Sequence, residues 1–422
     1  MDEKQPPSKR EDELSSALSE RILVFDGAMG TAIQNLELSH AAFGGAQYEG
    51  CNEHLALTQP ESIRKIHDDY LEAGADIIET DTFGGIRHVL GEYGLGEKTL
   101  ELNRAAARIA VGAARKYSTP QRPRFAAGSL GPGTKTISVT GGITFDEVRV
   151  NYAEAAQGLL EGGVDLLVLE TQQDTLNIKA SLLGFQDAFS RTGRKAPVIL
   201  AVSIETMGTM LGGQTAEALY RSIEHFDLLS IGLNCATGPD FMTDHLRTLS
   251  SLSRFPVVCY PNAGLPDEHG RYNESPKMVA QKLQRFAENG WLNIVGGCCG
   301  TTPEHIREIA KALKELPLRK PVRARSSAVS GLEALTIDDD KRPILVGERT
   351  NVIGSRKFKN LIIAGEFDKG AEIGRKQLRG GAQIIDVCLA NPDRDEKKDM
   401  ILFLDILTKK VKAPLMIDST DP

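Results

Sequence analysis

Three cysteines carry the strongest chemical signal in this sequence. Cys298 and Cys299 are adjacent in NIVGGCCGTTPEHI, and Cys235 lies well upstream in GLNCATGP, too far away for a zinc-finger spacing. A disulfide between neighbouring cysteines needs a strained ring, and the six cysteines are irregularly spaced in a chain without a secretion signal, which favours metal binding or catalysis. Three thiolates suit zinc better than magnesium or calcium and leave its fourth position open, as in catalytic zinc sites. Buried structural thiols are the alternative interpretation.

Eight short apolar runs recur along the chain, and each is followed by a longer amphipathic segment that we predict to be a helix. The runs cover residues 21–27, 75–83, 124–130, 164–171, 197–205, 228–236, 256–264 and 292–300. Nearly continuous apolar runs indicate strands that are covered on both faces, as in parallel sheets. Eight such units predict an α/β fold of the TIM-barrel, (β/α)8, type.

The polar and reactive residues fall at the carboxyl ends of these predicted strands, where TIM barrels form their active sites. In a closed barrel only one strand separates the sixth from the eighth, so Cys235 can approach the cysteine pair. Both adjacent cysteines can face one metal only if the backbone leaves strand geometry, which Gly296, Gly297 and Gly300 permit. Such a zinc site suits a substrate thiol whose pKa it lowers below ~8.5, and this predicts alkyl transfer to sulfur.

Five stretches together resemble the homocysteine S-methyltransferase family over about residues 21–316: FDGAMGT, GADIIETDTF, GLNCATGP, YPNAGLP and NIVGGCCGTTPEHI. The resemblance implies zinc on Cys235, Cys298 and Cys299, with the homocysteine thiol as the fourth ligand. It also implies contacts to homocysteine, and the expected substrate-binding set is Asp26, Gly27, Gly30, Glu79, Glu170 and Asn234. Turn capping by Asp26 and rim stabilisation by Glu79 are the structural alternatives, and Asn234 is expected to orient the site.

A second segment has a different character. GERTNVIGSRKFKNLI and GGAQIIDVCLANPD resemble the start of a pterin-binding barrel, and this order of modules is that of the cobalamin-dependent methionine synthases. The family's pterin-binding positions correspond to Glu348, Asn351, Asp386 and Asp418, whereas Cys388 stands where the family usually has Asn. We predict strands at 344–350, 383–389 and 413–420, with helices around 359–380 and 394–411. Three strands are too few for a barrel, so we expect a truncated domain with an incomplete tetrahydrofolate site.

The predicted organisation is a polar, partly disordered lead (1–20), a homocysteine-binding barrel (21–316), a linker without strong helix or strand signal (317–343) and a partial pterin-binding domain (344–422). A net charge of −7 argues against nucleic-acid binding, and no apolar run approaches the ~20 residues of a membrane span. The polar N-terminus lacks a signal-peptide core, which predicts a cytoplasmic protein.

The sequence thus predicts methyl transfer to the zinc-activated thiolate of homocysteine, giving methionine. The resemblance implies methylcobalamin as the donor, recharged from methyl-tetrahydrofolate, with the cobalamin-binding module on a missing C-terminal region or a separate chain. One alternative is direct use of betaine or a sulfonium donor. The other is a non-catalytic fragment that binds zinc and homocysteine.

Overall fold

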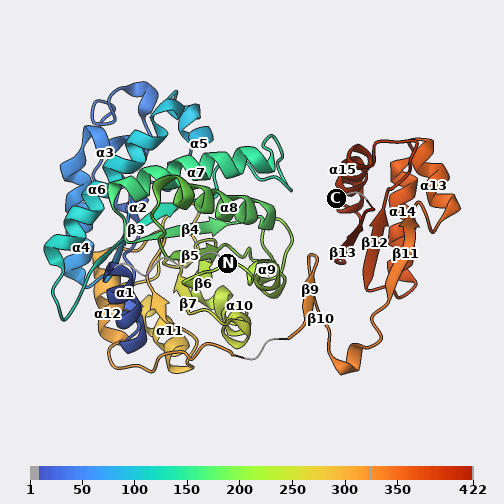
Figure 1. The fold of residues 1–422 in the computed structure, drawn as a ribbon. Coiled ribbons are helices and arrows are strands. Elements are labelled where there is room, and N and C mark those ends of the chain that lie inside the picture. The colour runs from blue at the N-terminus through green and yellow to red at the C-terminus, as the bar shows by residue number, and fades with distance from the viewer. Residues whose placement is uncertain (1–8, 324–325, 421–422) are drawn as a thin grey trace. The chain divides into compact units, whose positions relative to one another are not determined.

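The computed structural model describes residues 9–323 and 326–420. These residues divide into two compact units, drawn in Figure 1. The first comprises residues 9–212 and 226–323, and the second comprises residues 213–225 and 326–420. Within the described residues, no helix combines the length and apolar character needed to cross a membrane.

The first unit contains eight parallel strands that form one sheet. In chain order they are β1 (Leu23–Val24), β2 (Ile77–Glu79), β3 (Phe125–Leu130), β4 (Leu166–Gln172), β5 (Val198–Val202), β6 (Ser230–Asn234), β7 (Val257–Tyr260) and β8 (Ile294–Val295). Their spatial order is β1-β8-β7-β6-β5-β4-β3-β2, and a parallel bridge between Phe25 and Ile77 joins the two ends of the sheet. The predicted barrel is therefore confirmed, and β6 and β8 flank β7 as expected.

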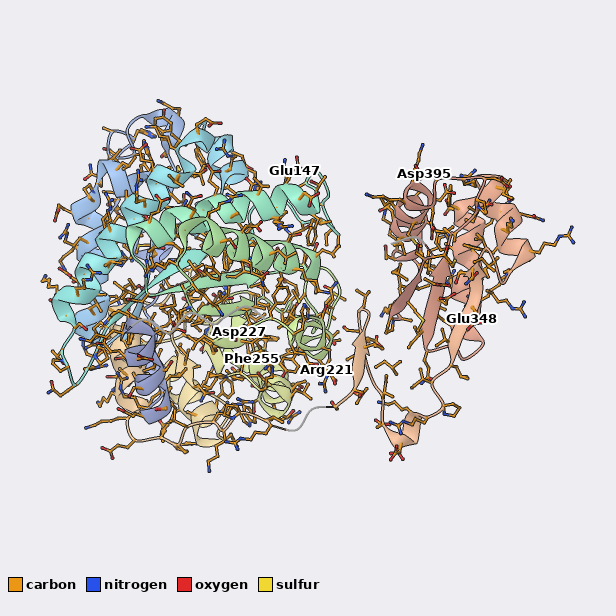
Figure 2. All side chains as sticks on the ribbon, in the orientation of Figure 1. Glu147, Arg221, Asp227, Phe255, Glu348 and Asp395 are labelled. Atoms are coloured by element: carbon orange, nitrogen blue, oxygen red, sulfur yellow. The ribbon has the colours of Figure 1, made fainter. Side chains whose placement is uncertain are left out.

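Helices alternate with these strands along the chain. The main ones are α4 (Pro60–Ala73), α6 (Thr99–Tyr117), α7 (Phe145–Gly162), α8 (Thr175–Thr192), α9 (Ala216–Ile223), α10 (Pro239–Leu252), α11 (Pro276–Glu288) and α12 (Pro303–Ala312). Their starts follow local rules: four begin with proline, and α7 begins with a capping box between Thr144 and Glu147, the latter labelled in Figure 2. Helix α4 ends at Gly74, whose φ of 115° is left-handed.

Inward-pointing side chains from the strands fill the barrel, and Phe25 stacks on Tyr260 with ring centroids 5.5 Å apart. Helix α1 (Lys9–Glu20) adds Leu14, Ala17 and Leu18 to the same core. Within the lead that was predicted to be partly disordered, residues 9–20 form a helix, because apolar residues at helical spacing give this short polar segment one buried face. Residues 1–8 lie outside the described residues.

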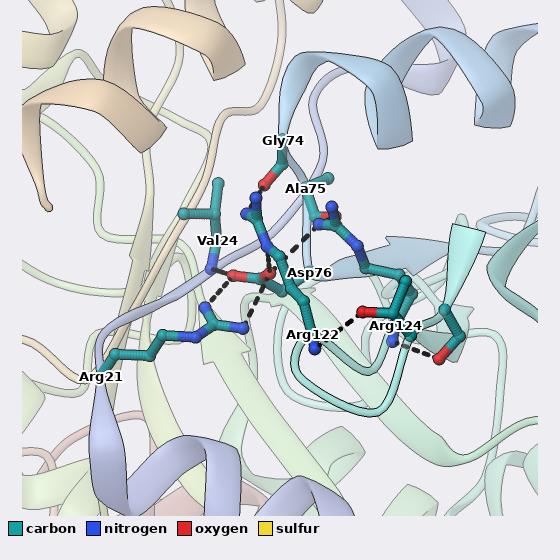
Figure 3. Close-up of polar contacts among 9 residues, drawn as sticks. Arg21, Val24, Gly74, Ala75, Asp76, Arg122 and Arg124 are labelled. Atoms are coloured by element: carbon teal, nitrogen blue, oxygen red, sulfur yellow. Dashed lines mark hydrogen bonds and ion pairs between the residues drawn. The ribbon is translucent and has the colours of Figure 1, made fainter.

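The amino-terminal ends of β1–β3 are tied together by one carboxylate. Asp76, which has no solvent exposure, accepts hydrogen bonds from Arg21, Arg122 and Arg124 and from the backbone N–H of Val24, as Figure 3 shows. Because buried carboxylates are stable only when paired, these contacts fix the end of the barrel opposite the cysteines.

The second unit contains a parallel sheet of β11 (Val346–Asn351), β12 (Ile384–Cys388) and β13 (Leu415–Asp418), in that order. Three helices accompany it: α13 (Arg356–Ile363), α14 (Phe367–Arg379) and α15 (Glu396–Leu407), the last capped by Asp395, which Figure 2 labels. The single helix predicted over 359–380 is two helices, because Gly365 adopts a left-handed φ of 72° between them.

The predicted linker is also more ordered than expected. It contains an antiparallel hairpin of β9 (Ala328–Ser330) and β10 (Ala334–Thr336). Within the second unit, the hairpin is hydrogen-bonded to the segment that carries α9: the Thr215 N–H donates to the Leu332 carbonyl at 3.1 Å. All six hairpin residues are half-buried, with no alternation between buried and exposed positions. Strands of this kind are hard to recognise in sequence, because the signal for a half-buried strand is alternation of apolar and polar residues.

Candidate functional site

Cys235, Cys298 and Cys299 lie together at the carboxyl end of the barrel strands. Their sulfur atoms are all within 4.8 Å of one another, with 3.9 Å between Cys235 and Cys299 and 4.0 Å between Cys298 and Cys299. Tetrahedral zinc with Zn–S bonds of ~2.3 Å separates its sulfurs by about 3.8 Å. The three thiols therefore fit a zinc ion.

The backbone turns sharply at the first of these cysteines. Cys235 follows the last residue of β6, and both it and Ala236 are left-handed, with φ values of 56° and 47°. Left-handed non-glycine residues cost energy and cluster at functional sites. This turn takes the Cys235 side chain out of the regular alternation of the strand.

The cysteine pair is held against the residues that follow β7. Cys298 N–H donates to the Pro261 carbonyl at 2.8 Å, and Cys299 N–H donates to the Asn262 side-chain oxygen at 3.1 Å. The Thr301 hydroxyl donates to the Cys298 carbonyl at 2.7 Å. These bonds fix the loop geometry that lets two consecutive side chains approach one centre, as the flanking glycines predict.

Gly300 is the glycine in this loop that a side chain would disturb most. Its φ is 78°, and an added Cβ would lie 2.3 Å from the Cβ of Tyr272. We expect Gly300→Ala to lower the free energy of unfolding by about 1–3 kcal/mol and to weaken zinc binding, since Cys299 must move. Gly290→Ala is the matched control, because Gly290 has a φ of 68° but meets no atom within 4 Å. Equal zinc affinity in both variants, measured by chelator competition, would contradict this expectation.

The three thiols change one another's pKa values. Hydrogen bonds from Cys235 and then from Cys298 lower the pKa of the Cys299 thiol, whereas the pKa values of Cys235 and Cys298 are raised. Three converging thiols attract a soft cation, and binding such a cation displaces their protons.

Three carboxyl groups, those of the buried Asp26 and Glu170 and of the half-buried Glu79, lie at the same end of the barrel. Asp26 and Glu170 are 2% and 5% exposed, and one oxygen each of Asp26 and Glu79 is buried without a hydrogen-bond partner among the described residues. The other Asp26 oxygen accepts the Glu79 N–H at 2.9 Å. Unpaired buried carboxylate oxygens are costly, so this trio is incomplete without a cation or a proton.

Burial raises the pKa of all three carboxyl groups above their ordinary values. For Glu170 it does so to about 7, and for Asp26 and Glu79 the negative charge of Glu170 adds to the effect. Asn234, whose side chain hydrogen-bonds to Glu170, directly precedes Cys235 in the chain, so Glu170 lies beside the thiol cluster. A ligand carrying an ammonium group would relieve this repulsion.

Asn234, the last residue of β6, orients Glu170. Its side-chain N–H₂ donates to Glu170 at 3.2 Å and to the Thr171 hydroxyl at 2.7 Å, while its oxygen accepts the Thr171 N–H at 2.8 Å. The Ser129 hydroxyl donates to the other Glu170 oxygen. The role of Asn234 in orienting a bound substrate stays a prediction.

Gly27 and Gly30 flank the start of the short helix α2 (Met29–Gln34), directly after Asp26. A Cβ at Gly27 would lie 2.7 Å from the Thr301 hydroxyl and 2.8 Å from the Tyr70 ring, so only glycine fits there. The nearest atom to a Cβ at Gly30 is 4.0 Å away. Packing therefore explains Gly27 but not Gly30.

Sequence reasoning missed two side chains at this end of the barrel. Tyr260 ends β7, is 2% exposed, and its hydroxyl is buried without a hydrogen-bond partner among the described residues. Ser129 holds Glu170 from β3. The tyrosine was detectable as a polar group ending an apolar run, but a serine inside a buried strand gives no such signal.

The remaining cysteines lie outside the cluster, and all three are buried. The Cys259 sulfur packs 3.9 Å from that of Met242, as core packing predicts. Cys51 occupies a loop that looks polar in sequence, yet it is 1% exposed.

In the second unit, the strand ends bring together the residues matched to pterin binding. The Asn351 side chain donates to Asp386 at 3.0 Å and to Asp418 at 3.2 Å. Burial raises the pKa of Asp386, with further contributions from Asp418 and Glu348, and Figure 2 labels Glu348 on its strand. Cys388 is fully buried and pairs in register with Asn351 and Asp418.

Comparison with known proteins agrees with this geometry. The family model of homocysteine S-methyltransferases matches residues 23–313, and that of pterin-binding enzymes matches residues 347–422. The homocysteine methyltransferase MmuM of Escherichia coli has a similar fold at 23% sequence identity. Its metallated form gives a TM-score of 0.59 over 71% of this chain and 99% of that chain, and its oxidised form gives 0.57 over 71% and 98%. This chain therefore belongs to the homocysteine S-methyltransferase family.

Proposed function

We propose that this protein transfers a methyl group to the thiol of homocysteine, giving methionine, with zinc held by Cys235, Cys298 and Cys299. The observation that carries the proposal is the placement of the thiol cluster beside the carboxyl trio. Homocysteine presents a thiol and an ammonium group a few bonds apart. The two parts of the site suit these two groups.

The chain's own residues bind and orient the substrate in this proposal. Asp26, Glu79 and Glu170 accept the substrate ammonium group, whose charge offsets their mutual repulsion. Asn234 keeps Glu170 in place, and the backbone near Gly27 and Gly30 is assigned to the substrate carboxylate. When bound by three thiolates, zinc supplies a coordination position that lowers the pKa of a substrate thiol and keeps it nucleophilic.

We assign the methyl donor to methylcobalamin, recharged from methyl-tetrahydrofolate, because a pterin-binding family match follows the barrel in the same chain. We place the barrel domain at 21–316, the linker at 317–343 and a partial pterin-binding domain at 344–422. Glu348, Asn351, Asp386 and Asp418 are the proposed pterin contacts. Burial of Cys388 leaves its thiol no role in contacting the pterin.

Homocysteine binding is expected to release close to one proton from its thiol in the zinc-loaded protein near neutral pH. Calorimetry in buffers of different ionisation enthalpy measures this release. Homoserine is the control ligand, since it keeps the ammonium and carboxylate groups and reports only protons lost from the carboxyl trio. Equal proton release by both ligands, or release that persists without zinc, would contradict the proposed site.

A donor screen separates the proposal from its alternatives. Homocysteine methylation with free methylcobalamin supports the assigned donor, whereas turnover with betaine or a sulfonium compound alone favours direct transfer. Zinc and homocysteine binding without turnover on any donor identifies a non-catalytic binding protein.

A further inference from the structure

Tyr260 is a buried tyrosine whose hydroxyl group is left without a partner. It ends β7, its side chain is 2% exposed, and its hydroxyl forms no hydrogen bond with any of the described residues. A buried polar group without a hydrogen bond destabilises a protein, and a binding role is one explanation for keeping it. The hydroxyl is therefore a candidate contact for a ligand.

The ring of Tyr260 is held inside the barrel. It stacks on the ring of Phe25, with centroids 5.5 Å apart and planes inclined by 20°, and both rings belong to the barrel core. Phe25 forms a parallel bridge with Ile77 of β2 and directly precedes Asp26. The stacking thus connects the tyrosine to the strands that carry Asp26 and Glu79.

Tyr260 belongs to the same inward-facing layer as the carboxyl groups. Side chains two positions apart in a strand point to the same face of the sheet. Tyr260, Glu79 and Glu170 each follow, by two positions, a residue of the barrel core, namely Val258, Ile77 and Val168. Tyr260 also pairs in register with Asn234, whose side chain donates to Glu170 at 3.2 Å. The strand geometry therefore turns the tyrosine toward the carboxyl trio.

The unpaired atoms of these side chains match an ammonium group in number. Asp26 and Glu79 each have one buried oxygen without a partner among the described residues, and the Tyr260 hydroxyl is the third such atom. Glu170 differs, because Ser129 and Asn234 each donate to one of its oxygens. An ammonium group has three N–H donors. A tyrosine hydroxyl can accept one of them while it donates its own proton to a carboxylate.

We infer that the Tyr260 hydroxyl binds the ammonium group of the substrate, together with the unpaired oxygens of Asp26 and Glu79. The inference rests on the proposed function and deepens it, because it requires an aminothiol substrate at the carboxyl trio. A neutral hydroxyl adds a contact without adding negative charge to carboxyl groups that already repel one another. Tyr260 thus favours thiols that carry an amino group over thiols that lack one.

Tyr260→Phe removes only the hydroxyl and keeps the ring on Phe25. We expect the affinity of the zinc-loaded full chain for homocysteine to fall about 10- to 100-fold, as is typical for a hydrogen bond to a charged group. Aminopropanethiol, which lacks the carboxylate of homocysteine, should lose affinity by the same factor. Mercaptobutanoate, which lacks the amino group, should bind both proteins equally. Calorimetric titration measures all three affinities.

Tyr152→Phe is the matched control. Tyr152 is fully buried on the outer helix α7, and its hydroxyl donates to the Gly131 carbonyl. This variant should unfold at lower urea and keep its affinity for all three thiols. Tyr260→Phe should show the opposite behaviour and, without substrate, unfold at the same or higher urea than the unmodified protein, because its hydroxyl has no hydrogen bond to lose.

The three ligands separate the possible failures. Unchanged affinity for homocysteine in Tyr260→Phe would overturn the inference and leave the proposed function intact. A loss seen with mercaptobutanoate but not with aminopropanethiol would also overturn it, since the hydroxyl would then bind the carboxylate. Failure of the unmodified, zinc-loaded protein to bind homocysteine would overturn both the inference and the proposed function.

Discussion

Replacing Cys298 with alanine is expected to abolish stoichiometric zinc binding and to reduce methyl transfer by more than about 100-fold. Mutating a residue that hydrogen-bonds to a metal ligand typically lowers metal affinity or activity about 10- to 100-fold, and removing the ligand itself should lower them further. The Cys298 sulfur lies 4.0 Å from that of Cys299 and also packs against the barrel core. Without it, two thiols would leave two open positions, and the metal would lose both affinity and its selective fourth site.

Cys259→Ala is the control for this experiment. Cys259 is fully buried on the neighbouring strand β7, but its sulfur faces Met242 and lies outside the cluster. This variant should keep one zinc per chain and full activity, with a loss of about 1 kcal/mol in unfolding free energy from the small cavity. Metal analysis and methyl transfer from methylcobalamin give the two readouts. Full metal content and activity in Cys298→Ala would show that the zinc assignment is wrong.

Replacing Glu170 with glutamine is expected to lower kcat/KM for homocysteine by about 100- to 1,000-fold, because removing one partner of a buried charge pair costs about 2–5 kcal/mol. Asn234 and Ser129 already hold this side chain, so the variant changes its charge more than its position. The loss should appear mainly in KM, since the ammonium group is bound in both ground and transition states.

The same substitution is expected to stabilise the substrate-free protein above neutral pH. Burial raises the Glu170 pKa from 4.5 to about 7, so the group contributes stability that is fully present below pH 4.5 and lost as the pH rises through 7. At pH 8 its ionisation in the folded state costs up to about 3 kcal/mol. Glu170→Gln should therefore unfold at higher urea than the unmodified protein at pH 8, with little difference at pH 4.5.

Glu288→Gln serves as the control for both measurements, because Glu288 is exposed and its side chain accepts a hydrogen bond from the exposed-face residue Gln284. It should change neither kcat/KM nor the pH dependence of unfolding. Unchanged kcat/KM in Glu170→Gln, or a variant less stable than the unmodified protein at pH 8, would remove Glu170 from the proposed ammonium site.

The eight-unit barrel was predictable because the local sequence pattern identifies each strand and each helix. Buried parallel strands require continuous apolar runs, and the helices carry proline, threonine or glycine at their ends, so composition alone marks the alternation. The linker hairpin was not predictable. Its half-buried residues are ordered by pairing with a segment more than a hundred residues away, and such contacts leave no periodic signal.

The ligand chemistry of the site could be predicted from residue types alone: three cysteines, carboxyl groups at strand ends, and glycines beside the cysteine pair. How these groups meet depends on the folded chain. It brings three sulfurs within 4.8 Å through left-handed residues at Cys235 and Ala236, and it buries the carboxyl groups until their pKa values rise. It also sets Tyr272 over Gly300. Residue types fix what a group can bind, whereas distances and desolvation depend on contacts between distant parts of the chain.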